Sequence, residues 1–390
     1  MYLRIDNTSS FLLALQLPTL LNGKIIAGIG AGIAIVIIVV SIFAFSNLEQ
    51  NGIGLQTISR NEKLGLVINT PTSAVTIQQL DKIYEDAAST GIGRSNVYLF
   101  WNMVEPQKGM YNFHDTDVLM SLNKKNDLKV TLYFSIINGK TLGPFPDWMG
   151  KPRLHAISDD DIVNILDVLL SRYNIIDKVI IGGGIDAHFR YEEELMPTYK
   201  DLFNNVYEKI KEKHPNVKIG NSFSLNSIME QELEHIVSEL SMGDFVAFTY
   251  FPVDSLNEIV KTPSDARADL EKIFELVPDK KISLFELSWS TSDFVGGNEE
   301  DQADFIPIAY DFYNDNEPKI EFFTWYRQYD RPEGTCEIDL SQIEGFIGIG
   351  TSEFVAERLG HYICNAGLID VDGKPKPAWN EFEKVIRQNQ

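Results

Sequence analysis

Eight short apolar runs recur along most of the chain and predict buried β-strands. They are rich in Val, Ile, Leu and Phe and do not alternate strictly between apolar and polar residues. Strands of that kind are covered on both faces, as in parallel sheets flanked by helices. The predicted strands are Leu64–Asn69, Asn96–Trp101, Lys129–Ser135, Lys178–Gly182, Val217–Asn221, Phe245–Tyr250, Lys281–Leu287 and Ile320–Trp325.

Amphipathic segments between these runs predict helices. The segment Ile77–Ala88 places its apolar residues on one helical face. The segment Asp159–Tyr173 opens with an acidic first turn, which stabilises the amino end of a helix. Further helices are predicted over Tyr199–His214, from Pro263, from Asn298 and over Ser352–Cys364.

The alternation of strands and helices predicts a (β/α)8 TIM barrel over residues 64–390. An open, doubly wound sheet is the alternative. Against that alternative, no glycine-rich phosphate-binding turn opens the first helix. The run Gly182-Gly183-Gly184 is not followed by an evident helix start either, so it makes a poor dinucleotide motif.

An uncharged run at residues 25–45 precedes the barrel. Its length is about the 20 residues that cross a bilayer. We expect a single transmembrane helix, an uncleaved signal-anchor, between a short N-terminal segment (1–24) and a linker (46–63); a buried core helix and a cleaved signal peptide are the alternatives. Arg4 and Lys24 before the run, and Glu49 after it, favour a main domain that is extracellular at the cell membrane.

The formal net charge is -22. An acidic surface repels nucleic acid and anionic lipid and tolerates neutral ligands, although it can also serve solubility alone. The two cysteines, Cys336 and Cys364, can form a disulfide in an outward-facing domain or remain buried thiols. No Cys/His cluster has metal-ligand spacing, and we expect no metal and no cofactor.

Aromatic residues gather where the predicted strands end. In a (β/α)8 barrel this end carries the active site. Indole rings pack against the apolar faces of sugars while polar groups bind hydroxyls, so the group predicts a carbohydrate cleft; core or loop packing is the alternative for each tryptophan. The candidate substrate-binding residues are Trp101, Asn102, Trp148, Asn221, Trp289 and Trp325.

One carboxylate lies near the end of the predicted strand Lys281–Leu287. A lone acid such as Glu286 at the carboxyl end of a strand typically serves chemistry in α/β barrels. A structural ion pair with Arg94 or Arg327 is the alternative. If Glu286 is catalytic, its natural partner is a second acid on an earlier strand. The best candidate strand has Gly182-Gly183-Gly184 where that acid would be expected.

Five segments carry a family resemblance in the same order along the chain: Arg94–Phe113 with its Trp and Glu-Pro, Pro146–Trp148, Thr249–Pro252, Phe285–Trp289 and Gly367–Trp379. Together they resemble retaining glycoside hydrolases of the large (β/α)8-barrel clan, whose two catalytic glutamates end strands four and seven. The resemblance covers roughly Leu64 to the C-terminus.

The resemblance implies that Glu286 is the nucleophile, that Tyr250 orients it and that Trp325 forms part of a sugar platform. The Asn-Glu pair of strand four aligns with Gly183-Gly184, which removes the expected general acid/base. Retaining hydrolysis uses two carboxyl groups about 5 Å apart, so this departure affects the chemistry directly.

Asp186 and His188 are the candidate replacements for that acid. Asp186 lies two positions beyond Gly184, on the same side of an extended strand, and His188 can donate a proton near neutral pH. The sequence predicts a membrane-anchored glycoside hydrolase with altered acid/base machinery that acts on O-glycosidic bonds of an extracellular polysaccharide or glycan. A catalytically inactive carbohydrate-binding barrel and a scaffold that binds protein through the same face are the alternatives.

Overall fold

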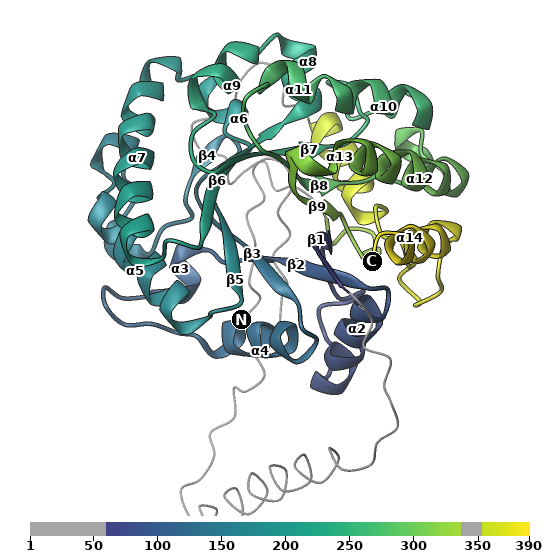
Figure 1. Ribbon diagram of the computed structural model, residues 1–390, viewed down its shortest axis with the longest axis horizontal. Helices are drawn as coiled ribbons and strands as arrows, with labels where there is room; N and C mark the ends of the chain where they lie inside the picture. Colours follow the sequence, from purple (N-terminus) through teal and green to yellow (C-terminus); the bar gives the residue numbers. More distant parts are fainter. Residues whose placement is uncertain (1–59, 337–352) are drawn as a thin grey trace, which may run out of the picture.

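The computed structural model describes residues 60–336 and 353–390 (Figure 1). The membrane helix expected at residues 25–45 lies outside these ranges, as do the N-terminal segment and most of the linker. Within the described ranges, no helix combines the length and the apolar character that a bilayer crossing requires.

The strands form a closed barrel. One nine-stranded sheet has the order β2-β1-β9-β8-β7-β6-β5-β3-β4, and β2 also pairs with β3, which closes the ring. All pairs are parallel except that of β4 with β3. The strands are β1 (Asn61–Leu66), β2 (Ile92–Tyr98), β3 (Lys129–Asn138), β4 (Thr141–Leu142), β5 (Ile176–Gly183), β6 (Lys218–Ser224), β7 (Phe245–Tyr250), β8 (Ile282–Leu287) and β9 (Ile320–Trp325).

Helices surround the barrel and cover the outer faces of its strands (Figure 1). The outer ring contains α2 (Ile77–Ser89), α4 (His114–Lys125), α5 (Asp159–Arg172), α7 (Met196–Lys213), α9 (Glu234–Leu240), α10 (Pro263–Glu271), α12 (Glu299–Asn316) and α14 (Pro377–Gln388). Shorter helices and one further long helix lie in the connections: α3 (Trp101–Val104), α6 (Asp186–Phe189), α8 (Leu225–Gln231), α11 (Ile273–Leu276) and α13 (Glu353–Cys364).

The predicted barrel is confirmed, and its closure excludes the open doubly wound sheet. Helix α2 begins where the amphipathic pattern begins because Thr76 and Gln79 form a reciprocal capping box. The bounds of β7 and β9 are those predicted. The first two strands, β1 and β2, each end three residues before the predicted ends at Asn69 and Trp101, and this shift changes which residues lie at the mouth.

Side chains alternate between the barrel interior and the helix layer. On β9, Phe322 contacts Phe245 of β7 inside the barrel, with ring centroids 5.4 Å apart. The next residue, Phe323, contacts Tyr310 of α12 outside it, at 5.1 Å. Alternation with a period of two therefore decides, for each residue near a strand end, whether it faces a ligand or a helix.

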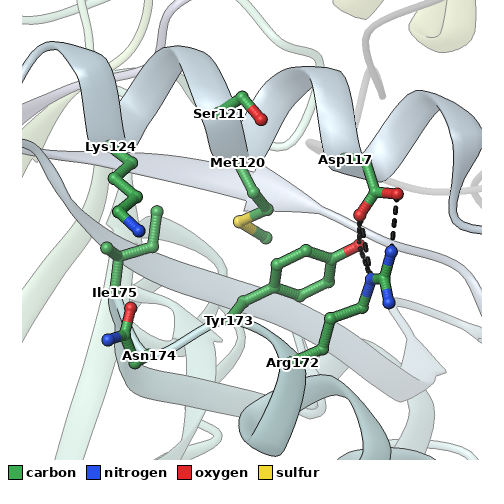
Figure 2. Close-up of a pocket in the computed structure, with 8 residues that line it drawn as sticks. All are labelled: Asp117, Met120, Ser121, Lys124, Arg172, Tyr173, Asn174 and Ile175. Atoms are coloured by element: carbon green, nitrogen blue, oxygen red, sulfur yellow. Dashed lines mark hydrogen bonds and ion pairs between the residues drawn. The ribbon is translucent and has the colours of Figure 1, made fainter. Parts of the chain in front are cut away.

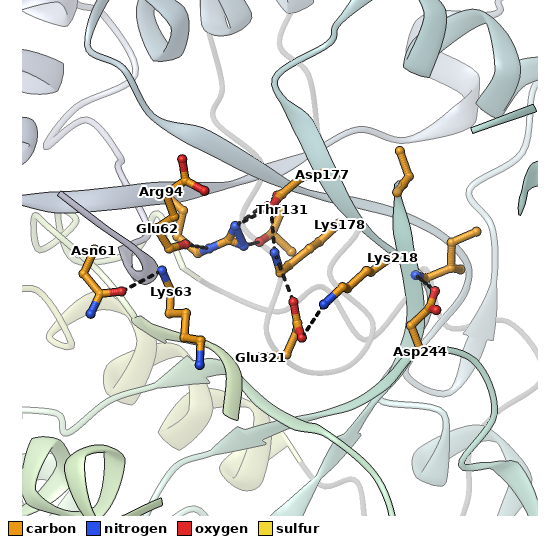
Figure 3. Close-up of polar contacts among 12 residues, drawn as sticks. Asn61, Glu62, Lys63, Arg94, Thr131, Asp177, Lys178, Lys218, Asp244 and Glu321 are labelled. Atoms are coloured by element: carbon orange, nitrogen blue, oxygen red, sulfur yellow. Dashed lines mark hydrogen bonds and ion pairs between the residues drawn. The ribbon is translucent and has the colours of Figure 1, made fainter. Parts of the chain in front are cut away.

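An ionic network closes the barrel at the amino ends of its strands (Figure 3). Arg94 of β2 is fully buried and donates to both carboxylate oxygens of Asp177 of β5, at 2.9 and 3.0 Å. Lys178 lies 3.4 Å from Glu321 of β9, which also pairs with Lys218 of β6 at 2.7 Å. Arg94 is thus committed to Asp177, and the alternative that it pairs with Glu286 is wrong.

A surface pocket lies near the same end of the barrel, between α4 and the segment that follows α5 (Figure 2). Its polar groups already bind one another: Arg172 and Tyr173 both donate to Asp117, at 2.7–2.9 and 2.6 Å. Residues 173–175 lead directly into the start of β5, so the pocket lies away from the end that carries the chemistry of such barrels.

We expect Asp177→Asn to destabilise the barrel by about 2 kcal/mol, because it leaves the buried guanidinium of Arg94 without its carboxylate. Urea unfolding at pH 7 measures this change. Asp81→Asn is the matched control, because Asp81 pairs with Lys125 at 2.7 Å where both side chains are partly exposed, and such pairs contribute about 1 kcal/mol or less. Equal losses in the two variants would contradict a structural role for the buried pair.

Candidate active site at the carboxyl ends of the strands

Glu286 faces the barrel interior because β8 carries one extra residue. The β8 residues Leu284 and Leu287 pair with Phe323 and Trp325 of β9, so three steps on β8 match two on β9. A bulge of this kind re-aims side chains, and here two consecutive residues of β8 meet the same ring. Phe285 contacts the ring of Tyr98 at 5.8 Å, and the Tyr98 hydroxyl donates to Glu286 Oε1 at 2.5 Å.

The carboxyl group of Glu286 is fully buried. Burial raises its pKa to about 8, against the opposing effects of the Tyr98 hydrogen bond and the charge of Arg327. Glu286 Oε2 has no hydrogen-bond partner among the described residues. At neutral pH the group is therefore mainly protonated, and one of its oxygens makes no hydrogen bond within the described residues.

The two glycines at the end of β5 differ in their surroundings. A Cβ on Gly183 would lie 2.0 Å from the hydroxyl oxygen of Tyr133, so a side chain there would collide with the tyrosine. A Cβ on Gly184 would meet nothing closer than 3.6 Å, although its φ of +56° favours glycine. Tyr133 occupies the space beside Gly183, where it stacks on Phe285 with centroids 5.7 Å apart.

Asp186 opens α6 just beyond these glycines, and its carboxyl group is fully buried. Its Oδ1 accepts from the backbone N–H of Ser224 at 2.8 Å, and its Oδ2 has no partner among the described residues. Burial raises the pKa of Asp186 to about 6, so the group holds a proton at mildly acidic pH.

His188 lies on the same short helix and is buried. Its Nδ1 lies 3.0 Å from the carbonyl oxygen of Lys140, and because that oxygen only accepts, Nδ1 carries the proton. Burial lowers the pKa of His188, which favours the neutral ring. Of the two candidate replacements, Asp186 is therefore the one whose environment favours a protonated acid.

Four of the residues expected at the mouth instead face the helix layer. The Tyr250 hydroxyl donates to Asp269 of α10 at 2.7 Å and does not orient Glu286. The tyrosine that donates to Glu286 is Tyr98. The reason is alternation: Tyr250 and Trp325 end regular strands one residue out of phase with the interior. Trp325 and Trp289 both pack against Phe305 of α12, with ring centroids 5.9 and 5.2 Å apart. Asn221 Oδ1 accepts a hydrogen bond from the Tyr199 hydroxyl of α7 at 2.7 Å.

The other two candidate tryptophans lie in the loop region beyond β2 and β3. Trp101 is buried at the start of α3 and donates to Glu105 Oε2 at 2.6 Å. Trp148 is half-buried, packs edge-on against Trp101 and donates to the carbonyl oxygen of Glu105 at 3.2 Å. Asn102 is exposed. Of this group, only Trp148 and Asn102 present surface to a ligand.

Tyr98 and Tyr133 are part of the site but were not predicted from the sequence, and Arg327 was predicted only as a possible structural ion-pair partner of Glu286. Tyr98 is the last residue of β2, and a correctly placed strand end would have identified it. Arg327 lies two residues beyond β9, and its charge acts on both Glu286 and Tyr98. Among the described residues no ion pair or hydrogen bond joins Glu286 to Arg327, and Arg327 acts on Glu286 through its charge alone.

We expect Glu286→Gln to gain stability relative to the wild type as the pH rises. The raised pKa of Glu286 means that the folded state keeps this proton between about pH 4.5 and 8 while the unfolded chain loses it. Wild-type stability then falls by up to about 1.4 kcal/mol per pH unit across that window. Urea unfolding at pH 4, 6 and 9 measures the difference between the two proteins. Glu208→Gln, an exposed carboxylate on α7, is the control, and a pH-independent difference for Glu286→Gln would contradict the assignment.

Comparisons with known proteins agree with the fold. No protein-family model and no curated protein matches the chain. Among solved structures, a GH5_18 protein from Bifidobacterium longum in complex with Manβ1-4GlcNAc matches with a TM-score of 0.59 and 13% identity, over 84% of this chain and 78% of that one. A GH5_18 protein from Streptomyces cattleya in complex with the same disaccharide has a TM-score of 0.58 and 13% identity, over 84% and 81% of the two chains.

Xylanase 10B from Thermotoga maritima matches with a TM-score of 0.52 and 14% identity, over 84% of this chain and 95% of that one. At these identities the likeness shows the fold and leaves the activity open. The chain therefore has the (β/α)8-barrel fold found in GH5 and GH10 glycoside hydrolases.

Proposed function

We propose that the protein acts on O-glycosidic bonds of an extracellular polysaccharide or glycan by a retaining mechanism, with Glu286 as the nucleophile. The observation that carries this proposal is the inward-facing carboxyl group at the end of the seventh barrel strand, held by Tyr98 at 2.5 Å. The complexes of the GH5_18 proteins with Manβ1-4GlcNAc support a carbohydrate ligand.

In this mechanism Glu286 attacks the anomeric carbon and forms a covalent glycosyl-enzyme, which water then hydrolyses. The attack requires the ionised carboxylate, and the hydrogen bond from Tyr98 and the charge of Arg327 both favour that form. Positive charge that develops on the sugar ring in the transition state stabilises it further. The raised pKa of Glu286 predicts that the reaction needs neutral to alkaline pH.

The leaving oxygen needs a proton, and Gly183-Gly184 cannot supply it. We propose Asp186 as the replacement acid, because its buried Oδ2 has no partner among the described residues. The pKa of Asp186, about 6, lies below that of Glu286, so only a small fraction of Asp186 holds a proton at the pH where Glu286 is ionised, and this slows the reaction further. His188 is the second choice, since its Nδ1 proton is engaged by the Lys140 carbonyl. A positioned acid/base contributes roughly 10²–10⁴-fold, so substrates whose leaving groups need no proton should react fastest.

We also propose that residues 25–45 anchor the protein in the membrane and that the barrel lies outside the cell. Cys336 and Cys364 form a disulfide in the structure, with Cα atoms 5.7 Å apart. Disulfides persist in oxidising compartments and are rare in the cytosol, which supports this location.

A second candidate function is carbohydrate binding without hydrolysis. Two observations favour it: no carboxylate occupies the end of β5, where Tyr133 fills the space beside Gly183, and the raised pKa of Glu286 leaves little nucleophile at neutral pH. The two functions differ in whether Glu286 forms a covalent bond.

We expect the full chain, incubated at pH 8 with 2-fluoro-glycosides that carry a dinitrophenyl leaving group, to gain the mass of one sugar at Glu286. Such leaving groups need no proton, so the missing glutamate does not prevent the attack. Intact and peptide mass spectrometry across a panel of sugars measures the labelling. Binding of these sugars without any adduct would favour the second candidate, and neither binding nor labelling would contradict both.

We expect Tyr98→Phe to slow this labelling about tenfold at pH 7, because a lost hydrogen bond to the carboxylate raises the pKa of Glu286 further. The pH of half-maximal labelling should rise accordingly. Tyr250→Phe is the matched control: it removes the hydrogen bond to Asp269 in the helix layer and should leave the labelling rate unchanged. Equal slowing in both variants would contradict the assignment of Tyr98.

We expect Gly184→Glu to increase turnover of glycosides with poor leaving groups by at least about tenfold, since it returns a carboxyl group to the strand end. The position has room for a side chain, and its left-handed backbone costs roughly 1–2 kcal/mol. The ratio of rates on phenyl and dinitrophenyl glycosides measures the gain. Gly183→Ala is the contrast: the clash with Tyr133 should lower the melting temperature without any gain. No change in that ratio for a folded Gly184→Glu protein would contradict the proposed deficit.

A further inference from the structure

Two buried arginines follow the last barrel strand without carboxylate partners. Arg327 is 1% exposed and Arg331 is 8% exposed. Arg327 lies over the ring of Tyr326 and donates to its hydroxyl through Nη2, but Arg327 Nε and Nη1 and Arg331 Nε have no hydrogen-bond partner among the described residues. Arg94 behaves differently: it is equally buried, but it binds both oxygens of Asp177. Burial of a guanidinium without a carboxylate and with unpaired N–H groups is costly, so these two arginines indicate a site for a ligand.

The acids nearest to these arginines do not neutralise them. Asp330 lies between them in the sequence, but it is bound to Lys376 at 2.7 Å and accepts from the Gly367 N–H at 2.8 Å. Glu286 is the other acid whose charge acts on Arg327, and at neutral pH it is mainly protonated. Burial and the nearby charge of Arg331 lower the pKa of Arg327 to about 9. The mouth therefore holds an excess of buried positive charge.

The backbone around Arg331 is held in place. Its N–H donates to the carbonyl oxygen of Cys364 at 2.9 Å, and Cys364 forms the disulfide with Cys336. Asp330 N–H donates to the carbonyl oxygen of Ile369 at 2.8 Å. The backbone of the segment that carries both arginines is thus fixed to the end of α13 and to the segment between α13 and α14.

We propose that Arg327 and Arg331 form an anion site beside Glu286 that binds the negatively charged group of an acidic sugar, either a carboxylate or a sulfate ester. This inference rests on the proposed carbohydrate function and deepens it by naming the substrate class. A planar guanidinium binds two oxygens of such a group at once. The chain as a whole carries a net charge of -22, so its surface repels long polyanions and the attraction is confined to this buried pair.

The test is direct binding of matched sugars to the full chain. The pairs are methyl glucuronoside with methyl glucoside, methyl galacturonoside with methyl galactoside, and glucose 6-sulfate with glucose; inorganic sulfate is added as a bare anion. Isothermal calorimetry at fixed ionic strength gives the dissociation constants. We expect at least one acidic sugar to bind about tenfold or more tightly than its neutral partner, the magnitude of a hydrogen bond to a charged group. The carboxylate and sulfate arms identify which anion is preferred.

The variants separate this inference from the proposed function. Arg331→Met should remove the preference for the acidic sugar and leave neutral-sugar binding unchanged, while Arg331→Lys should retain part of it and guards against misfolding. Arg172→Met, at the surface pocket on the far side of the barrel, is the control and should change neither. Binding of neutral and acidic sugars with equal affinity would overturn the anion site alone. Sulfate binding without any sugar binding would uphold the anion site and overturn the proposed function, and no binding of either would overturn both.

Discussion

The extra residue in β8 determines what the barrel interior contains at its carboxyl end. Without it, strict alternation would send either Phe285 or Glu286 into the helix layer. With it, both side chains meet Tyr98 of β2 on the opposite side of the closed sheet. The neighbouring strands, β7 and the part of β9 from Phe322 onward, keep their alternation near the mouth and turn Tyr250 and Trp325 outward. One local irregularity thus separates the chemical group of the site from the residues that only hold the barrel together.

The same burial that holds Glu286 controls its protonation. A carboxyl group in so apolar a setting takes up a proton unless positive charge compensates, and the Tyr98 hydrogen bond and Arg327 do so only in part. The charges of Arg327 and Glu286 are coupled: an anion bound to the arginine would offset the charge that favours ionised Glu286. Binding of an acidic group and activation of the nucleophile therefore compete, unless the cationic transition state restores the balance.

The sequence sufficed for the fold and only in part for the site. Apolar runs bounded by helical segments located the barrel strands, and β7 and β9 were placed to the residue. Strands covered on both faces carry no alternation, however, so the sequence does not reveal which way Tyr250 or Trp325 points. The apolar pattern predicts that the second strand ends three residues later than it does, which makes Tyr98 an interior residue of that strand instead of its last. Glu286 is evident in the sequence because it is the only acid in an apolar run, whichever residues of that strand face the barrel interior.

Different physical constraints favour glycine at positions 183 and 184, and the difference affects which groups can lie near Glu286. Gly183 is fixed by packing, because the Tyr133 ring takes the volume that a side chain would need, and that ring also stacks on Phe285 next to Glu286. Gly184 has room and is held only by its backbone conformation. The aromatic rings of Tyr98, Tyr133 and Phe285 therefore line one side of Glu286, whose carboxyl group is fully buried. The buried acid that follows these glycines is Asp186 at the start of α6, so the proposed replacement of the strand-four glutamate depends on a residue just beyond the strand.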